Sequence, residues 1–164
     1  MTTTKPALLI QTLEQEIKLV EQLIAILEEE KNALIARQFD LLEILAEKKQ
    51  AIANQLEQTT QIRTDLLELN LQIKSAKQTL EDFLLQSSTQ EAQHIKALNE
   101  KLAENLIRCR ELNAINGQVI TSNMYTRQEI INTITGQTPD NTTSVYTASG
   151  GVKSSNDSNS HQKA

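Results

Sequence analysis

The chain has 164 residues, a formal net charge of −5 and 2% aromatic residues. Nucleic acid is a poor match as a ligand, because binding it relies on Lys and Arg to neutralise phosphates and on aromatic rings to stack on bases. The single cysteine, Cys109, excludes an intrachain disulfide and fits a reducing compartment.

The N-terminal segment MTTTKPALLIQ contains no apolar stretch of signal-peptide length. The longest apolar runs, such as residues 23–27, are too short to cross a bilayer. We therefore expect a cytoplasmic protein. Because large aromatic side chains are scarce, Leu and Ile must form the core along helix faces, which favours an elongated helical protein over a thick globular one.

The first helix is expected to begin after Thr4, a suitable N-cap, with Pro6 in the first turn where its missing N–H costs little. Its apolar side chains repeat at alternating spacings of four and three residues. This heptad pattern predicts that the partner is another helix. The positions are Leu13, Ile17, Val20, Ile24 and Leu27.

A break or sharp bend is predicted at residues 37–40. Asp40 followed by Glu43 matches a capping box, in which Asp40 would be the N-cap of the next helix. The alternative is one continuous, kinked helix across this region.

The apolar pattern resumes at Leu41. No Gly or Pro interrupts residues 7–116, so the sequence predicts a second helix over residues 41–86. The pair Thr59-Thr60 is its weakest point, because β-branched residues are poorer helix formers.

A second capping box, Ser88 to Glu91, predicts a third helix from about residue 89. Gly136 is expected to end this helix. One apolar stripe runs through Ile95, Leu98, Leu102, Leu106, Cys109, Leu112, Ile115 and Val119, and a second set, rotated from the first, comprises Ile120, Met124, Ile131 and Ile134.

The pair Asn116-Gly117 interrupts this helical pattern and has two interpretations. Glycine costs roughly 1 kcal/mol relative to alanine inside a helix. Gly117 could be a left-handed cap that ends the helix. It could instead mark a weak point inside the helix, so that the segment after residue 112 is marginally helical alone and orders when another helix docks. Periodicity does not choose between them.

No residue pattern indicates catalysis, a metal site or a cofactor site. The histidines, His94 and His161, lie in different regions, and one cysteine cannot provide zinc-ligand spacing. Neither a phosphate-binding loop nor a nucleophile elbow occurs. The carboxylates at 28–30 are typical of a solvated helix face, and Cys109 is interpreted as a small buried apolar side chain. We expect no enzyme activity and no cofactor.

Residues 137–164 are rich in Ser, Thr, Asn and Gly, and this composition predicts a disordered tail. Within the tail, Val145 and Tyr146 form an isolated apolar pair. The predicted fold is therefore all-α, an elongated antiparallel bundle of about three long helices over residues 1–136, followed by a flexible tail over 137–164.

Three segments resemble the FlgN family of flagellar export chaperones: FDLLEILAEKKQAI at 39–52, CRELNAINGQVI at 109–120 and SVYTASGG at 144–151. The resemblance covers nearly the whole chain. It implies a cytoplasmic, non-enzymatic chaperone of flagellar type III export. Such proteins bind the hook-filament junction proteins of the FlgK and FlgL type by their terminal helices, prevent premature assembly, and deliver them to the export gate protein FlhA.

The resemblance also suggests which residues act. Leu112, Ile115, Val119 and Met124 are predicted to form one apolar contact for a client helix, with Asn116 and Gly117 as an adaptable point inside it. Tyr146 is predicted to dock on the export gate, because an aromatic residue in a polar tail has no core to join.

Long amphipathic helices also occur in proteins with two other functions. A self-associating coiled-coil protein or tether would form a stable homodimer and need no client, whereas the chaperone is expected to be a monomer or a weak homodimer. An amphipathic helix on a membrane surface is disfavoured by the absence of a basic face and of Trp.

Overall fold

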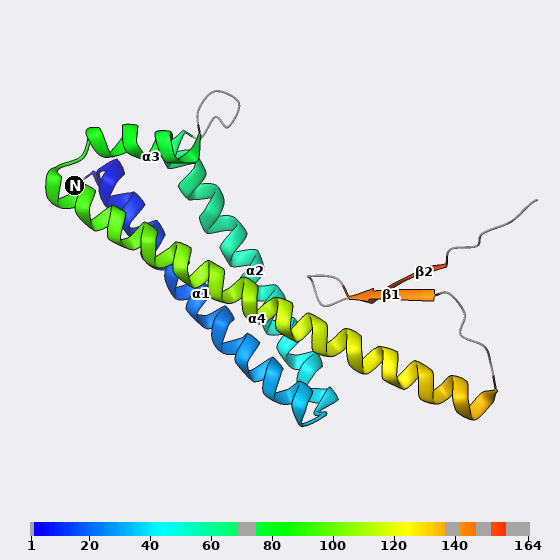
Figure 1. Ribbon diagram of the computed structural model, residues 1–164. Coiled ribbons are helices and arrows are strands. Elements are labelled where there is room, and N and C mark those ends of the chain that lie inside the picture. Colours follow the sequence, from blue (N-terminus) through cyan, green and yellow to red (C-terminus); the bar gives the residue numbers. More distant parts are fainter. Residues whose placement is uncertain (1, 69–74, 137–141, 147–151, 157–164) are drawn as a thin grey trace, which may run out of the picture.

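The computed structural model describes residues 2–68, 75–136, 142–146 and 152–156. These residues form three long helices, one short helix and a pair of strands (Figure 1). The prediction of an all-α protein with about three long helices is confirmed, and α3 is an addition to it. The elements are α1 (Lys5–Ile35), α2 (Phe39–Leu67), α3 (Ala76–Leu85), α4 (Thr89–Thr135), β1 (Thr142–Tyr146) and β2 (Val152–Asn156).

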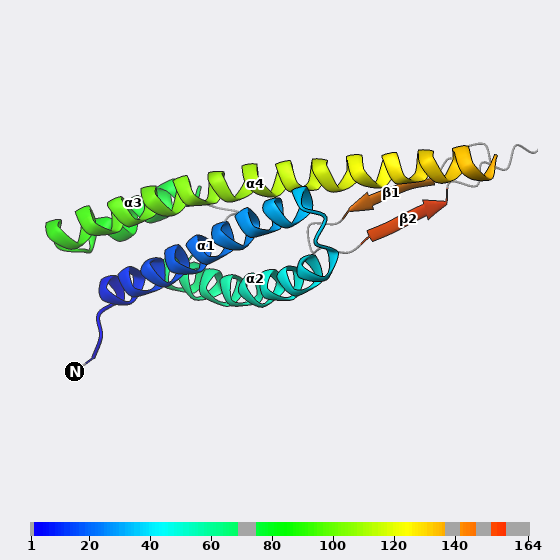
Figure 2. The ribbon, with the colours of Figure 1, turned by 90° about the horizontal axis from the view of Figure 1, so that it is seen from below.

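Helix α1 lies between α2 and α4 and packs against both (Figure 2). Ion pairs join Arg108 to Glu28 at 2.7 Å and Lys101 to Glu21 at 3.2 Å. Both pairs join residues 80 positions apart. Because this offset is constant along α1, α4 runs parallel to α1, while α2 returns antiparallel to both.

The predicted caps at the starts of α1 and α4 are confirmed. The Ala7 N–H donates to Thr4 Oγ1 at 3.4 Å. At α4, the Glu91 N–H donates to Ser88 Oγ at 3.2 Å, and the Ser88 N–H donates to the Glu91 carboxylate at 3.1 Å. Each reciprocal bond satisfies a backbone donor that the first helical turn leaves without a partner.

The predicted break at residues 37–40 is also confirmed, and a continuous kinked helix is excluded. Arg37 adopts a left-handed conformation with φ 55°, and the Gln38 N–H then donates to the Ala33 carbonyl at 2.9 Å. This is the usual geometry for ending a helix, although glycine is the residue that adopts it without strain. In a non-glycine residue the left-handed region costs roughly 1–2 kcal/mol.

The prediction that Asp40 is the N-cap of the second helix is wrong. The N-cap is Gln38, which forms no side-chain cap hydrogen bond, and Asp40 lies in the first turn of α2. The left-handed Arg37 reverses the chain so quickly that α2 begins before Asp40. The carboxylate of Asp40 still lies near the positive end of the helix dipole.

The predicted continuous helix over residues 41–86 is wrong as well. The observed helix α2 is unbroken at Thr59-Thr60, the expected weak point. It ends earlier than predicted, at Leu67, and the next residue, Glu68, has a left-handed φ of 51°. The Glu68 carboxylate accepts a hydrogen bond from Lys5 at 2.9 Å, so α2 ends where α1 begins. A left-handed residue cannot continue a right-handed helix, so α2 ends at this point.

Helix α3 begins with its own capping box. The Gln78 N–H donates to Ser75 Oγ at 3.3 Å, and the Ser75 N–H donates to the Gln78 side chain at 3.4 Å. The sequence Ser75 to Gln78 therefore carried the same signal as Ser88 to Glu91. It lies inside the predicted helix over residues 41–86, where the apolar pattern continues across it.

The core follows the heptad positions of α1. Four of the five predicted positions are buried. The fifth, Ile24, is half-buried and packs against the main hydrophobic cluster. This cluster joins side chains from all four helices: Leu9, Leu13, Ile17, Val20, Leu67, Leu84, Ile95 and Leu102. Among the described residues, no helix combines the length and apolarity needed to cross a membrane.

Part of the tail has regular backbone structure. Strands β1 and β2 pair antiparallel, with Tyr146 opposite Val152 and Thr142 opposite Asn156. The sequence of β1, TTSVY, is rich in the β-branched and aromatic residues that favour strands. The tail was predicted to be disordered over 137–164. These ten residues are a hairpin added to the all-α fold, and the other tail residues lie outside the described part of the chain.

Candidate functional site

The C-terminal part of α4 extends past the rest of the bundle (Figure 1). Helix α1 ends at Ile35, whereas α4 continues to Thr135. At the offset seen in the ion pairs, Ile35 lies level with Ile115, so α4 continues for about 20 residues, or about 30 Å, beyond α1. We call residues 118–135 of α4 the overhang. The buried residues of α4 all precede it: Ile95, Leu102, Leu112 and Asn116.

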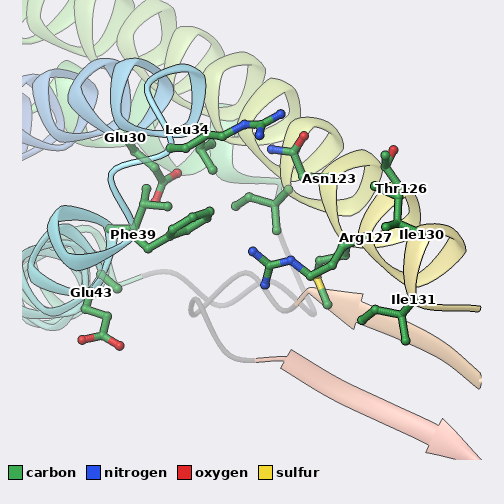
Figure 3. Close-up of a pocket in the computed structure, with 14 residues that line it drawn as sticks. Glu30, Leu34, Phe39, Glu43, Asn123, Thr126, Arg127, Ile130 and Ile131 are labelled. Carbon is green, nitrogen blue, oxygen red and sulfur yellow. The ribbon is translucent and has the colours of Figure 1, made fainter. Parts of the chain in front are cut away.

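A groove of about 500 Å³ lies between the overhang and the α1–α2 turn. Its walls are mainly apolar, and Phe39 stands opposite the overhang residues Ile130 and Ile131 (Figure 3). These three side chains are 55%, 54% and 44% exposed. One wall includes Leu34, Phe39 and Leu42, and the other includes Ile120, Met124 and Ile131.

A cation–π contact connects the two walls. The guanidinium carbon of Arg127 lies 5.4 Å from the centre of the Phe39 ring. Such contacts contribute about 0.5–1 kcal/mol at exposed sites. The contact is weak enough for a ligand to rearrange it, and it holds a cation at the mouth of an apolar groove.

Where α4 leaves the bundle, a buried polar cluster joins the three long helices. Glu30 of α1 is 2% exposed and also lines the groove. Lys49 of α2 donates to Glu30 Oε2 at 2.9 Å, and Asn116 of α4 donates to Glu30 Oε1 at 3.0 Å. The same amide group of Asn116 donates to the Leu27 carbonyl at 2.8 Å. We call Glu30, Lys49 and Asn116 the polar cluster.

The polar cluster fixes the register of the helices. A buried charge is tolerated only when it is paired and hydrogen-bonded, and here both carboxylate oxygens of Glu30 accept a bond. Sliding α4 along α1 by one turn would separate Asn116 from Glu30. The cluster therefore sets the point from which the overhang projects, and with it the shape of the groove.

The two interpretations of Asn116-Gly117 can now be compared with the structure. The prediction that Gly117 is a left-handed cap is wrong, because α4 is continuous to Thr135. The side chain of Asn116 is 1% exposed and finds partners on α1, and these tertiary bonds offset its poor helix propensity. Gly117 lies inside the helix, as the second interpretation requires, and ordering of the following segment on docking stays a prediction.

The structure does not bring the four predicted client contacts onto one surface. Leu112 is 9% exposed, Ile115 is 42% exposed, and Val119 is half-buried. Met124 lines the groove. Ile115 and Met124 are nine positions apart, which places them about 180° apart around the helix. Client binding by this set stays a prediction.

Sequence reasoning missed the wall that the α1–α2 turn contributes. Phe39 and Leu42 come from a segment that was interpreted as a helix boundary and as part of the family resemblance, and not as a binding surface. One signal was available, because Phe39 is one of only four aromatic residues and lies within the predicted break at residues 37–40. The pairing of this turn with a segment more than 80 positions later could not be seen from periodicity.

Two further predicted residues have different outcomes. Cys109 is half-buried against the core, and burial raises the pKa of its thiol, which is consistent with the packing role assigned to it. Tyr146 is the last residue of β1. Its docking role stays a prediction.

Comparisons with known proteins point in one direction. A family model described as FlgN protein matches residues 1–154. The chain is also similar to a solved structure from Pseudomonas aeruginosa, a protein assigned as flagella synthesis protein FlgN. The two are 27% identical, the match covers 73% of this chain and 90% of that chain, and the TM-score is 0.61. No match was found among curated protein sequences.

Proposed function

The chain belongs to the FlgN family, and on this basis we propose that it is a cytoplasmic chaperone of flagellar type III export. Its clients are proposed to be hook-filament junction proteins of the FlgK and FlgL type. The chaperone holds their terminal helices, prevents premature assembly in the cytoplasm, and delivers them to the export gate protein FlhA.

The groove beside the overhang is the observation that carries this proposal. A subunit whose terminal helix awaits partners in a filament is adhesive before assembly, and a groove with apolar walls can cover that face. No long helix packs on the overhang, and Ile130, Ile131 and Ile134 are 54%, 44% and 78% exposed. Burying one such side chain fully is worth about 1.5–3 kcal/mol, so a helix lying here would be held firmly.

The length of the overhang supports a role in binding. Isolated helices shorter than about 12–15 residues are marginal in water, and most helix stability comes from packing. The overhang is little longer than this limit, begins directly after Gly117, and buries no residue. A docked client helix would supply the packing that it lacks.

Among the predicted client contacts, Met124 is placed best to touch a client in the groove. Methionine suits a site that receives related helices, because its side chain is unbranched and adapts to different shapes. We propose that Ile120 and Ile131 act with Met124. Leu112, which faces the bundle, supports the site through packing, and Ile115 and Val119 are available to a client that wraps around the helix.

Gate docking is proposed for the tail. Tyr146 follows the overhang by a short stretch of chain, so a client in the groove and a gate at the tail can be engaged by the same molecule. The linkage raises the effective concentration of the gate. We expect Tyr146→Ala to weaken binding to FlhA and to leave client affinity unchanged.

The test of the groove is a double substitution on the overhang, Met124→Gln with Ile131→Gln. Both side chains line the groove and neither belongs to the buried core, so client affinity should fall at least about tenfold while the melting temperature stays nearly constant. Calorimetric titration with FlgK-type and FlgL-type proteins measures the affinity. Ile62→Gln is the matched control, since Ile62 is 52% exposed on α2.

Two outcomes would contradict this account. Equal client affinity for the double variant and the Ile62→Gln control would remove the groove from client binding. A stable homodimer that binds no client would favour the alternative of a self-associating coiled-coil protein, for which the exposed apolar overhang is also suited. Light scattering on the free chain distinguishes the two, and we expect the mass of a monomer or a weak homodimer.

A further inference from the structure

We propose that Arg37 and Arg127 bind a carboxylate on the client, so that the groove selects amphipathic helices with an Asp or Glu beside their aliphatic face. This inference rests on the proposed function and deepens it. It concerns the charge of the client helix, because apolar walls alone do not distinguish acidic helices from basic ones.

The first observation is that two arginines of the groove have no carboxylate partner. Arg37 comes from the α1–α2 turn and Arg127 from the overhang, and both line the groove. Among the described residues, no salt bridge joins either guanidinium to an Asp or Glu. The chain has 21 acidic and 16 basic residues, so carboxylates are the more abundant partner. Because no described carboxylate pairs with either arginine, both cations are left for a ligand.

The second observation is the backbone of Arg37. Its φ of 55° lies in the left-handed region at the end of α1, where glycine is the residue that fits without strain. An arginine at this position lowers the stability of the free protein. Strained residues that persist at the edge of a binding site often serve that site. The guanidinium of Arg37 is therefore the feature to test.

The third observation is how Arg127 is held. Its guanidinium lies over the ring of Phe39, with 5.4 Å between the guanidinium carbon and the ring centre. The cation–π contact restrains the guanidinium, whose planar set of N–H donors can bind a carboxylate with two parallel hydrogen bonds. A lysine ammonium could also lie over the ring, but it lacks this planar set of donors.

The acidic side chains near the groove do not cancel these charges. Glu30 is already bound to Lys49 at 2.9 Å in the polar cluster. Glu43 also lines the groove, but its carboxylate points away from Arg127 (Figure 3). With Glu30 paired to Lys49, the groove lining carries two arginines against one glutamate, Glu43, on a chain whose net charge is −5. An acidic client helix would be repelled elsewhere on the surface and attracted here.

The experiment uses the full chain and purified FlgK-type and FlgL-type proteins as probes. Arg37→Gly should raise the melting temperature, because glycine relieves the left-handed strain, and should weaken client binding by roughly three- to tenfold. Arg127→Gln should weaken binding by a similar factor. Glu68→Gly is the matched control: Glu68 has the same backbone conformation at φ 51° but lies at the other end of α2. It should leave client affinity unchanged.

A second arm neutralises the client. Each Asp and Glu of the client's terminal helix is replaced by Asn or Gln, and the effect of Arg127→Gln should then disappear, since no carboxylate remains to be lost. Binding that is equal for the wild type, Arg37→Gly and Arg127→Gln overturns the inference and leaves the proposed function intact. A wild-type chain that binds neither probe overturns the proposed function and this inference with it.

Discussion

The two parts of α4 show the same kind of helix in two different environments. Residues 89–117 pack along α1 and contain every buried residue of α4, whereas residues 118–135 contain none. Both parts carry apolar side chains at helical spacing. The difference arises because α1 ends at Ile35, and beyond it no long helix lies against α4, which packs only against strand β1 among the described elements. An apolar stripe becomes core where a partner helix exists and stays exposed where the partner ends.

The boundary between the two parts is marked by opposite features in adjacent residues. Asn116 is fixed by hydrogen bonds to α1, and Gly117 lacks a side chain that could stabilise the helix. The first part is thus held in register up to its last buried residue. The second part follows directly after Gly117, and glycine is the weakest helix former apart from proline.

The largest effect is expected at the polar cluster. Glu30→Gln keeps the shape of the side chain but removes the charge that Lys49 binds at 2.9 Å. Breaking a buried ion pair costs about 3–5 kcal/mol, because the remaining charge stays desolvated. Urea unfolding measures the loss. The neighbouring exposed Glu29, changed to Gln, is the control, with an expected change within about 0.5 kcal/mol; equal effects would show that the cluster does not hold the helices.

A second experiment compares the two parts of α4 directly. Leu102 is 4% exposed in the core, so Leu102→Ala should lower the free energy of unfolding by about 2–5 kcal/mol. Ile131 is 44% exposed on the overhang, and Ile131→Ala should change the free energy of unfolding by less than about 1 kcal/mol. Thermal and urea unfolding give both values. A large loss for Ile131→Ala would mean that the overhang belongs to the core.

The smallest effect is expected at the boundary itself. A Cβ at Gly117 would meet nothing within 4 Å, so Gly117→Ala should stabilise α4 by about 0.5–1 kcal/mol and increase helicity after residue 117. Gly136 also has open space around it, but its φ is +66°, so Gly136→Ala should weaken the last turn instead. Amide exchange along α4 measures both. Stabilisation by both substitutions, or by neither, would contradict the helix-interior assignment of Gly117.

Several features of the fold could be predicted from the sequence because they depend on local chemistry. The caps at Thr4 and Ser88 need only the residues beside them, and the heptad positions of α1 required burial whatever their partner. The break near residue 37 was also found. Its details were not, because a left-handed Arg37 is decided by how α2 packs on α1 and cannot be inferred from arginine itself.

Only part of the candidate site could be predicted from the sequence. Met124 was predicted, but Phe39 and the two arginines of the groove were not. The polar cluster was missed because Glu30 looked like one of three solvated glutamates, and its burial depends on Lys49 and Asn116, which lie 19 and 86 positions away. Long-range pairing of this kind leaves no periodic signal in the chain.

By itself, the sequence determined that this chain forms long amphipathic helices with defined starts, and its motifs placed it in the FlgN family. Helix formation depends on neighbours within a turn or two, so the necessary information is local. Only the tertiary structure decided where α2 stops, which apolar side chains of α4 stay exposed, and that a groove with two arginines lies beside the overhang. Those outcomes depend on the relative lengths and register of helices far apart in the chain, which are fixed when their side chains pack together.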